Sequence, residues 1–263
     1  MPFVKVNDIE LYYELQGDGP PLILIAGFAA HSAIWKDYIA PLSKQYQLLI
    51  FDNRGAGQSE APEIPYSIEM MAEDIVALME ALKISNAHFL GLSMGGAIVL
   101  QLCIEHPDKV KKAIVAGAFA KLPETAKWQI QASRKLLEAG MPFELFLESL
   151  LPWLFSNAFL SDTENVKKQL HQWTHNPYPQ SPAGYYGQSD AILQLDLRDR
   201  LKEIQCKTLV IAGEEDLYIP SSCFHQLMKR IPNAKLAVLK EQAHMFVSER
   251  PEEVIKLVKE FLG

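Results

Sequence analysis

One serine among three glycines is the feature of this sequence that most suggests chemistry. The hexapeptide GLSMGG occupies residues 91–96, directly after the apolar run AHFL at 87–90. Glycine weakens both strands and helices, so its repetition at a strand-to-helix turn needs a local cause. A serine at such a corner takes a strained backbone conformation that exposes its hydroxyl, and glycines two residues away avoid a clash. The pattern predicts that Ser93 is a nucleophile; the alternative is a glycine-rich turn with an incidental serine.

A nucleophilic serine needs a general base within hydrogen-bond reach, and seven histidines compete for that role. His244 follows the apolar run 236–239 in the loop KEQA, where we expect the carboxyl edge of a sheet, the usual location of sites in α/β folds. His171 and His175 are four residues apart and could bind a metal, but no carboxylate motif accompanies them, which favours a solvated helix face. The other histidines have structural interpretations at helix ends, strands or loops: His31, His88, His106 and His225. We therefore predict His244 as the base.

The acid that orients the histidine should also lie just beyond a strand. The apolar run Thr208–Ala212 ends in GEED at residues 213–216. We predict Asp216 as the acid, with Glu214 or Glu215 as alternatives because the sequence does not fix which side chain points inward. The chain order Ser93, Asp216, His244 matches the order expected for a true G-x-S-x-G turn.

Acyl transfer also needs amide donors for the developing oxyanion. The first donor should be the backbone N–H of Met94, directly after the nucleophile. We assign the second to Phe28, in the turn GFAA that follows the apolar run 22–26, although an ordinary strand-end turn is the alternative. The segment DNRGAGQS at 52–59 resembles a phosphate loop only weakly, since neither a P-loop lysine nor a following helix accompanies it.

Short apolar runs between turn residues predict the strands that must position these groups. Phe3–Val6 and Ile9–Leu15, separated by Asn7-Asp8, predict a starting hairpin. The remaining runs are Leu22–Ala26, Leu48–Phe51, Ala87–Leu90, Ala113–Ala116, Thr208–Ala212 and Leu236–Leu239. Strands that are apolar on both faces belong to a mostly parallel sheet with helices on both sides.

Amphipathic segments between the runs predict those helices. Ser67 is a plausible N-cap for a helix to about Leu82, Met94–Glu105 is apolar nearly all round, and Glu252–Leu262 follows Pro251. Alternating strands and helices predict a doubly wound α/β fold, and we expect residues 1–263 to form a single domain.

The alternation breaks at about residues 119–190, which have helical patterning and three of the four tryptophans. We interpret this stretch as a helical lid inserted in the domain. Most of its aromatic residues would form its own small core. Four of them are predicted to face a substrate cavity: Trp128, Phe146, Trp153 and Tyr186.

The composition limits the classes of partner. The chain has a formal net charge of −7 and scattered basic residues, which argues against binding to nucleic acid or an anionic membrane. Neither a secretory signal nor a bilayer-length apolar stretch is visible. Three widely spaced cysteines fit reduced thiols, so we expect a cytoplasmic protein that acts on a small-molecule substrate without a cofactor or metal. The sequence leaves the oligomeric state open.

Together these motifs resemble the α/β-hydrolase superfamily over almost the whole chain outside the insertion. The motifs are AGF at 26–28, FDNRGAGQS at 51–59, GLSMGG at 91–96, GEEDLYIP at 213–220 and AH at 243–244. The resemblance implies Ser93 as nucleophile, Asp216 as acid and His244 as base, with Phe28 and Met94 as oxyanion donors. One departure is Ala26, where many members have a histidine that supports the loop.

Within the superfamily the sequence is similar to small bacterial carboxylesterases, 3-oxoadipate enol-lactonases and aminoacrylate hydrolases. The leading hypothesis is a cofactor-free serine hydrolase of a small carboxylic ester or lactone. A second hypothesis keeps the triad but cleaves a C–C or carbamate bond, and a third is a hydrolase-fold receptor for a small molecule. A haloalkane dehalogenase or epoxide hydrolase does not fit, since both resemble this fold with an aspartate at position 93.

Overall fold

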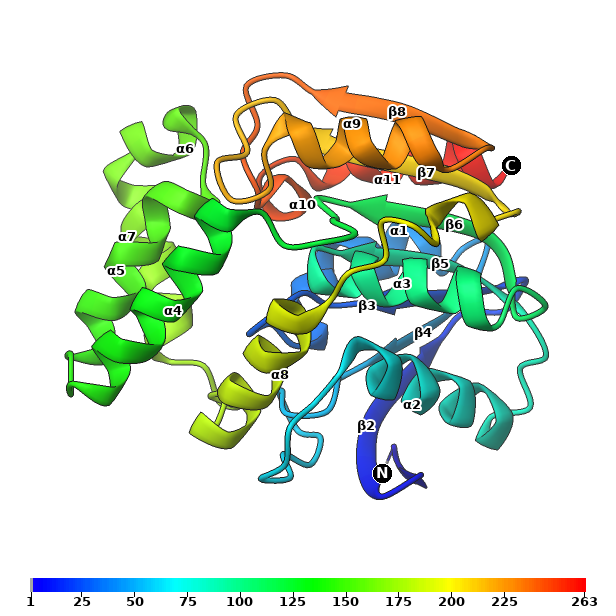
Figure 1. The fold of residues 1–263 in the computed structure, drawn as a ribbon, viewed down its shortest axis with the longest axis horizontal. Helices are drawn as coiled ribbons and strands as arrows, with labels where there is room; N and C mark the ends of the chain where they lie inside the picture. Colours follow the sequence, from blue (N-terminus) through cyan, green and yellow to red (C-terminus); the bar gives the residue numbers. More distant parts are fainter. Residues whose placement is uncertain (1) are drawn as a thin grey trace.

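The computed structural model describes residues 2–263, and its strands form one eight-stranded sheet (Figure 1). The strands are β1 (Phe3–Val6), β2 (Ile9–Gln16), β3 (Pro21–Ile25), β4 (Gln47–Phe51), β5 (Ala87–Leu92), β6 (Val110–Ala116), β7 (Lys207–Gly213) and β8 (Ala234–Leu239). Their order across the sheet is β1-β2-β4-β3-β5-β6-β7-β8. The predicted doubly wound α/β fold is confirmed.

Only the first strands depart from parallel pairing. β1 pairs antiparallel with β2, and β2 antiparallel with β4, while β4, β3, β5, β6, β7 and β8 are joined by parallel ladders. The β1–β2 turn contains Asn7 with φ 49°, a left-handed conformation that asparagine tolerates better than most residues. All the parallel strands therefore end at one edge of the sheet.

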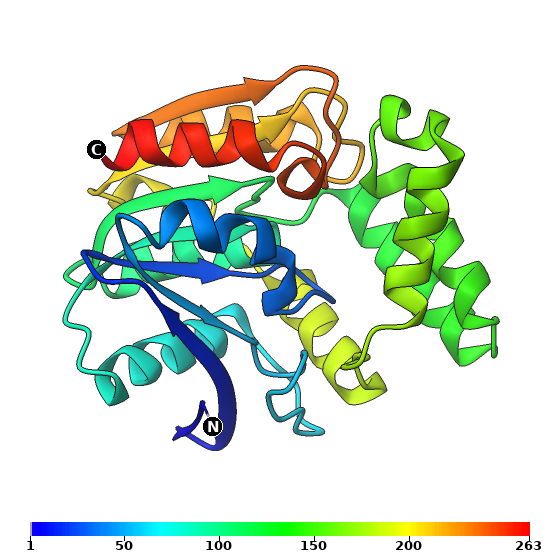
Figure 2. The same ribbon diagram turned by 180° about the vertical axis from the view of Figure 1, so that it is seen from behind.

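Alternate residues of the central strands enter two separate hydrophobic cores, one on each face. In β3, Ile23 and Ile25 belong to one core, and Leu22 and Leu24 to the other. The first core is covered by α2 (Ile68–Ala81), α3 (Met94–Glu105) and α9 (Ser221–Arg230). The second is covered by η1 (Ser32–Trp35), α1 (Lys36–Leu42), α10 (Phe246–Glu249) and α11 (Pro251–Leu262), as the rear view shows (Figure 2). Burial on both faces explains why the strands are apolar throughout.

Local signals set the ends of these helices. The Ser67 hydroxyl accepts the amide of Met70 at 3.1 Å and caps α2, as its sequence position predicts. Pro251 is the first residue of α11, where the missing N–H costs nothing. α3 is buried on nearly every side because it lies between the sheet and α2.

Five helices follow one another between β6 and β7. They are α4 (Glu124–Glu138), α5 (Phe143–Leu154), α6 (Asn157–Ser161), α7 (Thr163–Thr174) and α8 (Pro182–Gln194), followed by the short η2 (Leu201–Glu203). α4 to α7 gather beyond the strand ends, and α8 leads back toward the sheet (Figures 1 and 2). A bridge between Lys121 and Asp196 joins the start and the end of this helical segment.

Over residues 2–263, no helix is long and apolar enough to cross a membrane. The cytoplasmic location stays a prediction.

Candidate active site

Ser93 occupies the sharp turn between β5 and α3. Its backbone has φ 53° and ψ −115°, outside the helical and extended regions, so the residue is strained. A Cβ added at Gly91 would lie 2.2 Å from the carbonyl oxygen of Gly95, and one added at Gly95 would lie 2.3 Å from that of Ile25. Glycine is therefore required on both sides of the serine because backbone fills the space that a side chain would need.

Asp216 and His244 are hydrogen-bonded within the protein. The Nδ1 atom of His244 lies 2.8 Å from Oδ2 of Asp216, and the two residues are only 4% and 5% exposed, respectively. The other carboxylate oxygen, Oδ1, accepts the amides of Tyr218 at 2.9 Å and Ile219 at 2.7 Å. These contacts fix the carboxylate and orient the imidazole so that Nε2 lies on the side away from Asp216.

The ends of three neighbouring strands bring Ser93 and His244 into one region. The amide of Ser93 donates to the carbonyl of Ala116 at 2.7 Å. Gly117, the residue after Ala116, donates its own amide to the carbonyl of Ile211 at 2.8 Å. Gly117 has φ 55°, and a Cβ added there would lie 3.2 Å from Cε1 of His244. The backbone that holds the serine therefore also packs against the imidazole.

The turn after β3 lies beside the serine. A Cβ added at Gly27 would be 3.3 Å from the Cβ of Ser93. The amide of Phe28 takes part in none of the hydrogen bonds found among residues 2–263, whereas its neighbour Ala29 donates to Oε1 of Gln188 at 3.1 Å. Met94 is the first residue of α3, where N–H groups have no intrahelical acceptor. The amides of Phe28 and Met94 therefore have no acceptor among the hydrogen bonds of residues 2–263, as the predicted role of oxyanion donor requires.

Two buried amide side chains support this turn in the absence of a histidine at position 26. Asn53 donates from Nδ2 to the carbonyl of Ala26 at 3.1 Å. Gln188, which is fully buried on α8, receives the Ala29 amide and donates from Nε2 to the carbonyl of Arg54 at 2.9 Å. Asn53 and Gln188 therefore hold the backbone of this turn on both sides of Phe28.

The glycine-containing loop at 52–59 folds around a carboxylate and holds no phosphate-like space. Asp52 accepts the amides of Ser32 at 2.7 Å and Gln58 at 2.8 Å. A Cβ added at Gly57 would lie 2.1 Å from Oδ2 of Asp52, which explains the glycine. A phosphate would meet this negative charge, so the loop is structural.

A buried ion pair fastens the same loop to α2. Arg54 is 1% exposed and donates from Nε and Nη2 to the carboxylate of Asp74 at 2.5 and 2.8 Å. Its Nη2 also donates to Asp8 at 3.0 Å, and this guanidinium hydrogen bond lowers the pKa of Asp8. The interaction joins the first hairpin, the loop and α2.

Aromatic rings from the helical segment approach the turn that carries Phe28. The ring centroid of Tyr185, on α8, lies 4.9 Å from that of Phe28 and 6.3 Å from that of Phe146, on α5. Burial raises the pKa of Tyr185 to about 12. Tyr218 contributes a further buried ring, 5.3 Å from the imidazole of His244. We call Phe28, Phe146, Tyr185 and Tyr218 the aromatic cluster.

Of the four residues of the helical segment expected to face a cavity, Phe146 and Tyr186 lie beside Tyr185, with ring centroids 6.3 and 6.0 Å from it. Trp128 is 66% exposed on α4, and Trp153 is partly buried against the main core. The guanidinium carbon of Arg134 lies over the ring of Tyr186, 4.7 Å from the ring centroid. The sequence reasoning missed Tyr185 because adjacent residues of a helix point about 100° apart, and the dipeptide YY does not say which faces inward.

A model of the alpha/beta hydrolase fold family matches residues 20–251. This chain is a member of that family. It is 31% identical over 251 residues to 3-oxoadipate enol-lactonase 2 of Acinetobacter baylyi, covering 95% of this chain and 91% of that protein. It is 26% identical over 265 residues to "Putative carbamate hydrolase RutD" of Azorhizobium caulinodans, covering 100% and 98%.

The solved structures agree with this assignment. The crystal structure of the enol-lactonase from Burkholderia xenovorans LB400 is similar with a TM-score of 0.88 and 29% identity, covering 99% of each chain. The family membership that the motifs of the sequence suggested is therefore confirmed, and the protein is a hydrolase of this fold.

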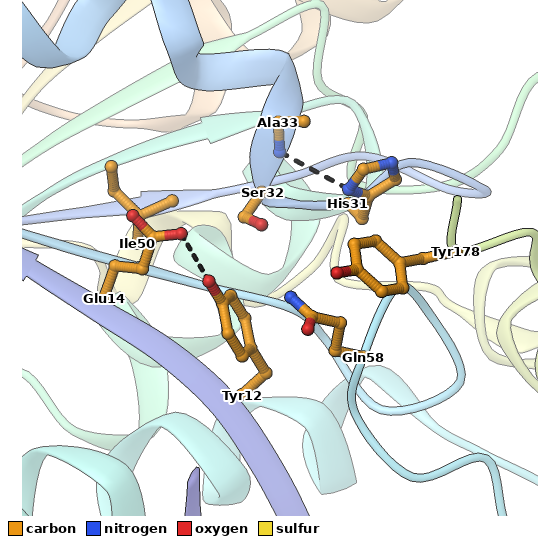
Figure 3. A pocket seen from close by; sticks show the side chains of 8 residues that line it. All are labelled: Tyr12, Glu14, His31, Ser32, Ala33, Ile50, Gln58 and Tyr178. Atoms are coloured by element: carbon orange, nitrogen blue, oxygen red, sulfur yellow. Dashed lines mark hydrogen bonds between the residues drawn. The ribbon is translucent and has the colours of Figure 1, made fainter. Parts of the chain in front are cut away.

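A pocket of about 200 Å³ lies where the segment that follows the Phe28 turn of this α/β hydrolase meets β2 and β4 (Figure 3). It is lined by Tyr12, Glu14, His31, Ser32, Ala33, Ile50, Gln58 and Tyr178. The hydroxyl of Tyr12 donates to Glu14 at 2.5 Å, and the ring of Tyr178 points toward His31 and Gln58. Neither Ser93 nor His244 lines this pocket.

The histidine pair of α7 is exposed at the surface of the hydrolase. The rings of His171 and His175 lie 3.9 Å apart. Among residues 2–263, no third histidine, cysteine or carboxylate joins them in a metal-binding group.

Proposed function

We propose that this protein is a serine hydrolase that cleaves a small carboxylic ester or lactone through an acyl-enzyme. The proposal rests above all on one arrangement. Asp216 is hydrogen-bonded at 2.8 Å to the imidazole of His244, which packs against Gly117. The residue before Gly117 is Ala116, and its carbonyl accepts a hydrogen bond from the amide of the strained Ser93. A serine, a histidine and a buried acid in this relation are the requirements of nucleophilic acyl transfer.

The first half-reaction forms the acyl-enzyme. Oγ of Ser93 attacks the carbonyl carbon of the substrate while Nε2 of His244 takes the hydroxyl proton. The negative charge on the carbonyl oxygen is stabilised by the amides of Phe28 and Met94, which are fixed in advance and need no reorganisation. As the tetrahedral intermediate collapses, His244 gives its proton to the leaving alkoxide or enolate oxygen.

The second half-reaction returns the free enzyme. A water molecule gives a proton to His244 and attacks the acyl carbon, and the C–O bond to Ser93 then breaks as the serine regains its proton. Asp216 keeps the imidazole in the productive tautomer and stabilises its charged form throughout. No step requires a cofactor.

We further propose that α4 to α8 act as a lid and that the aromatic cluster forms the wall of the acyl or alcohol site. The low exposure of Ser93, 6%, supports this role, as does the position of α4 to α7 beyond the ends of the strands (Figure 1). Rings from both the lid and the main sheet domain suit an apolar or planar substrate group. Trp128, which is exposed, would lie outside this site.

The name of the RutD relative supports a second candidate, hydrolysis of a carbamate by the same triad. A carbamate carbonyl is attacked in the same way, so the geometry at Ser93 alone does not distinguish the two substrates. Cleavage of a C–C bond would also use the triad. A receptor function would keep the fold with slow or absent turnover.

Hydrolysis of p-nitrophenyl acetate, butyrate and octanoate by the wild type and by Ser93→Ala, with a p-nitrophenyl carbamate beside them, tests the proposal. We expect repeated turnover of an ester by the wild type and a loss on the order of 10⁵- to 10⁶-fold in the variant. Preference for the carbamate would favour the second candidate. Equal activity of the two proteins would exclude Ser93 as nucleophile, and no turnover of any substrate by the wild type would favour the receptor.

A further inference from the structure

Two thiols that the catalytic proposal does not use lie against each other. The Sγ atoms of Cys103 and Cys206 are 3.6 Å apart, although the residues are far apart in the sequence. Cys103 is in the last turn of α3 and is 2% exposed, whereas Cys206 directly precedes β7 and is half-buried. Both thiols are free, as is that of Cys223 on α9.

The surroundings make the two thiols chemically unequal. The hydrogen bond between the Cys206 and Cys103 thiols, together with the Thr208 hydroxyl, lowers the pKa of Cys206 to about 7. The same interaction and complete burial raise the pKa of Cys103. A thiolate, not a thiol, is the nucleophile in reactions with oxidants, and the half-buried Cys206 can meet one. The pair thus contains one accessible nucleophilic sulfur and one sheltered thiol beside it.

The third cysteine provides an internal contrast. Cys223 is buried and burial raises its pKa to about 11, so little of it is thiolate near neutral pH. Its sulfur also has no second thiol as a hydrogen-bond partner among the described residues. Any selective oxidation of this protein should therefore begin at Cys206.

We propose that Cys206 and Cys103 form an oxidative modification site whose co-substrate is a hydroperoxide. The Cys206 thiolate attacks one peroxide oxygen, the O–O bond breaks, and a sulfenic acid and hydroxide (or alkoxide) form. The sulfur of Cys103 then attacks the sulfenic sulfur, forming the S–S bond and releasing water as Cys103 loses its proton. In total, two thiols and hydrogen peroxide give one disulfide and two waters.

Closing the bond requires only a small movement. A disulfide has an S–S distance of about 2.05 Å, so the two sulfurs at 3.6 Å must approach by roughly 1.5 Å. The bond would join the last turn of α3 to the start of β7, whereas Ser93 precedes the first turn of α3 and Asp216 follows the end of β7. Oxidation is therefore expected to raise the midpoint of thermal unfolding and leave the catalytic end of the fold in place.

The test treats the purified full chain with hydrogen peroxide near neutral pH and counts free thiols after denaturation. The wild type should fall from three thiols to one, and non-reducing peptide mapping should join the peptides of Cys103 and Cys206 in a monomer. Dithiothreitol should restore all three. Cys223→Ser is the matched control and should form the same cross-link, while Cys206→Ser should keep its two thiols over the same time.

Three results would overturn the proposal. They are irreversible oxidation of Cys206 without a cross-link to Cys103, a disulfide between two chains in place of the internal one, and loss of thiols from Cys206→Ser as fast as from the wild type. Circular dichroism of each variant checks that it is folded. In addition, alkylation of Cys206 in Cys223→Ser should accelerate as the pH rises through about 7.

Discussion

The side-chain oxygen of Gln188 accepts the backbone amide of Ala29 at 3.1 Å, which joins helix α8 to the turn beside the proposed nucleophile. The same side chain donates to Arg54 and is fully buried, so all of its connections are internal. A residue of the helical segment therefore determines the conformation of a turn that belongs to the sheet domain. If Phe28 donates to the oxyanion as proposed, the segment supports that donor through Gln188.

Gln188→Ala should lower kcat with little change in KM, because the turn that carries the Phe28 amide loses its support. Complete loss of one oxyanion donor costs about 10²- to 10³-fold, and a displaced donor should cost part of that. Gln101→Ala, which removes another buried amide from α3, is the control for lost stability. Steady-state kinetics and the stability of both variants are measured. If the two variants were equally stable and lost the same activity, the role of Gln188 would be contradicted.

Gly117→Ala should slow turnover through the imidazole. The new Cβ would lie 3.2 Å from Cε1 of His244, so the ring would have to move slightly, and the loss should stay below the roughly 100-fold that a displacement of about 1 Å can cost. Gly140→Ala is a matched control, because Gly140 also has a positive φ, 76°, with nothing within 4 Å of an added Cβ. Both variants should lose some stability from backbone strain, and only Gly117→Ala should lose activity. Unchanged kcat in Gly117→Ala would argue against His244 as the base.

Asp216→Asn should reduce kcat by about 10⁴-fold. An amide nitrogen facing Nδ1 of His244 would favour the wrong imidazole tautomer while leaving the packing intact. Glu215→Gln is the control, since Glu215 contacts Asn157 instead and was an alternative acid on sequence grounds. A larger loss in Glu215→Gln than in Asp216→Asn would reverse the assignment of the acid.

Phe146→Ala should change the preference among p-nitrophenyl esters by enlarging the aromatic cluster, with relatively better turnover of the octanoate. Trp128→Ala should leave the preference unchanged because that ring is 66% exposed. The measurement is the ratio of kcat/KM values for the acetate, butyrate and octanoate within each variant. A change in the amount of folded enzyme affects all three values equally and so does not alter these ratios. If Trp128→Ala shifted the ratios and Phe146→Ala did not, the substrate site would lie elsewhere in the lid.

Arg54→Met should lower the free energy of unfolding by about 3–5 kcal/mol, because it leaves the carboxylate of Asp74 buried without its partner. Arg134→Met breaks a partly exposed pair with Asp190 and should cost only about 0–1 kcal/mol. Urea unfolding monitored by circular dichroism compares the two. Similar losses in both variants would mean that burial does not distinguish these ion pairs.

The sequence predicted the sheet well because the central strands are buried on both faces and are apolar over most of their length. Its largest error is the start of β6, which begins at Val110 and not at 113, since Lys111 and Lys112 interrupt the apolar pattern. Lys112 is tolerated there because its amino group donates to the last carbonyls of α11. This contact joins residues far apart in the sequence, so the sequence around Lys112 does not reveal why a lysine is tolerated in the strand.

The candidate site also has a part that the sequence could predict and a part that it could not. Ser93, Asp216 and His244 follow strands, so their position could be inferred from the strands themselves. Tyr185, Gln188 and the exposed position of Trp128 depend on how α4 to α8 pack against the sheet. That packing joins residues far apart in the sequence, and helical spacing alone leaves the direction of each helix face open.

The hydrogen bonds from Ser93 to Ala116 and from Gly117 to Ile211 extend the sheet beyond its strands into the candidate site. The proposed nucleophile, acid and base, which follow β5, β7 and β8, therefore acquire their mutual geometry only when β5, β6, β7 and β8 have paired. These pairings are distant in the sequence and close slowly during folding. Recovery of esterase activity after dilution from denaturant should consequently lag behind recovery of helical signal, which would make turnover a reporter of the last stage of refolding.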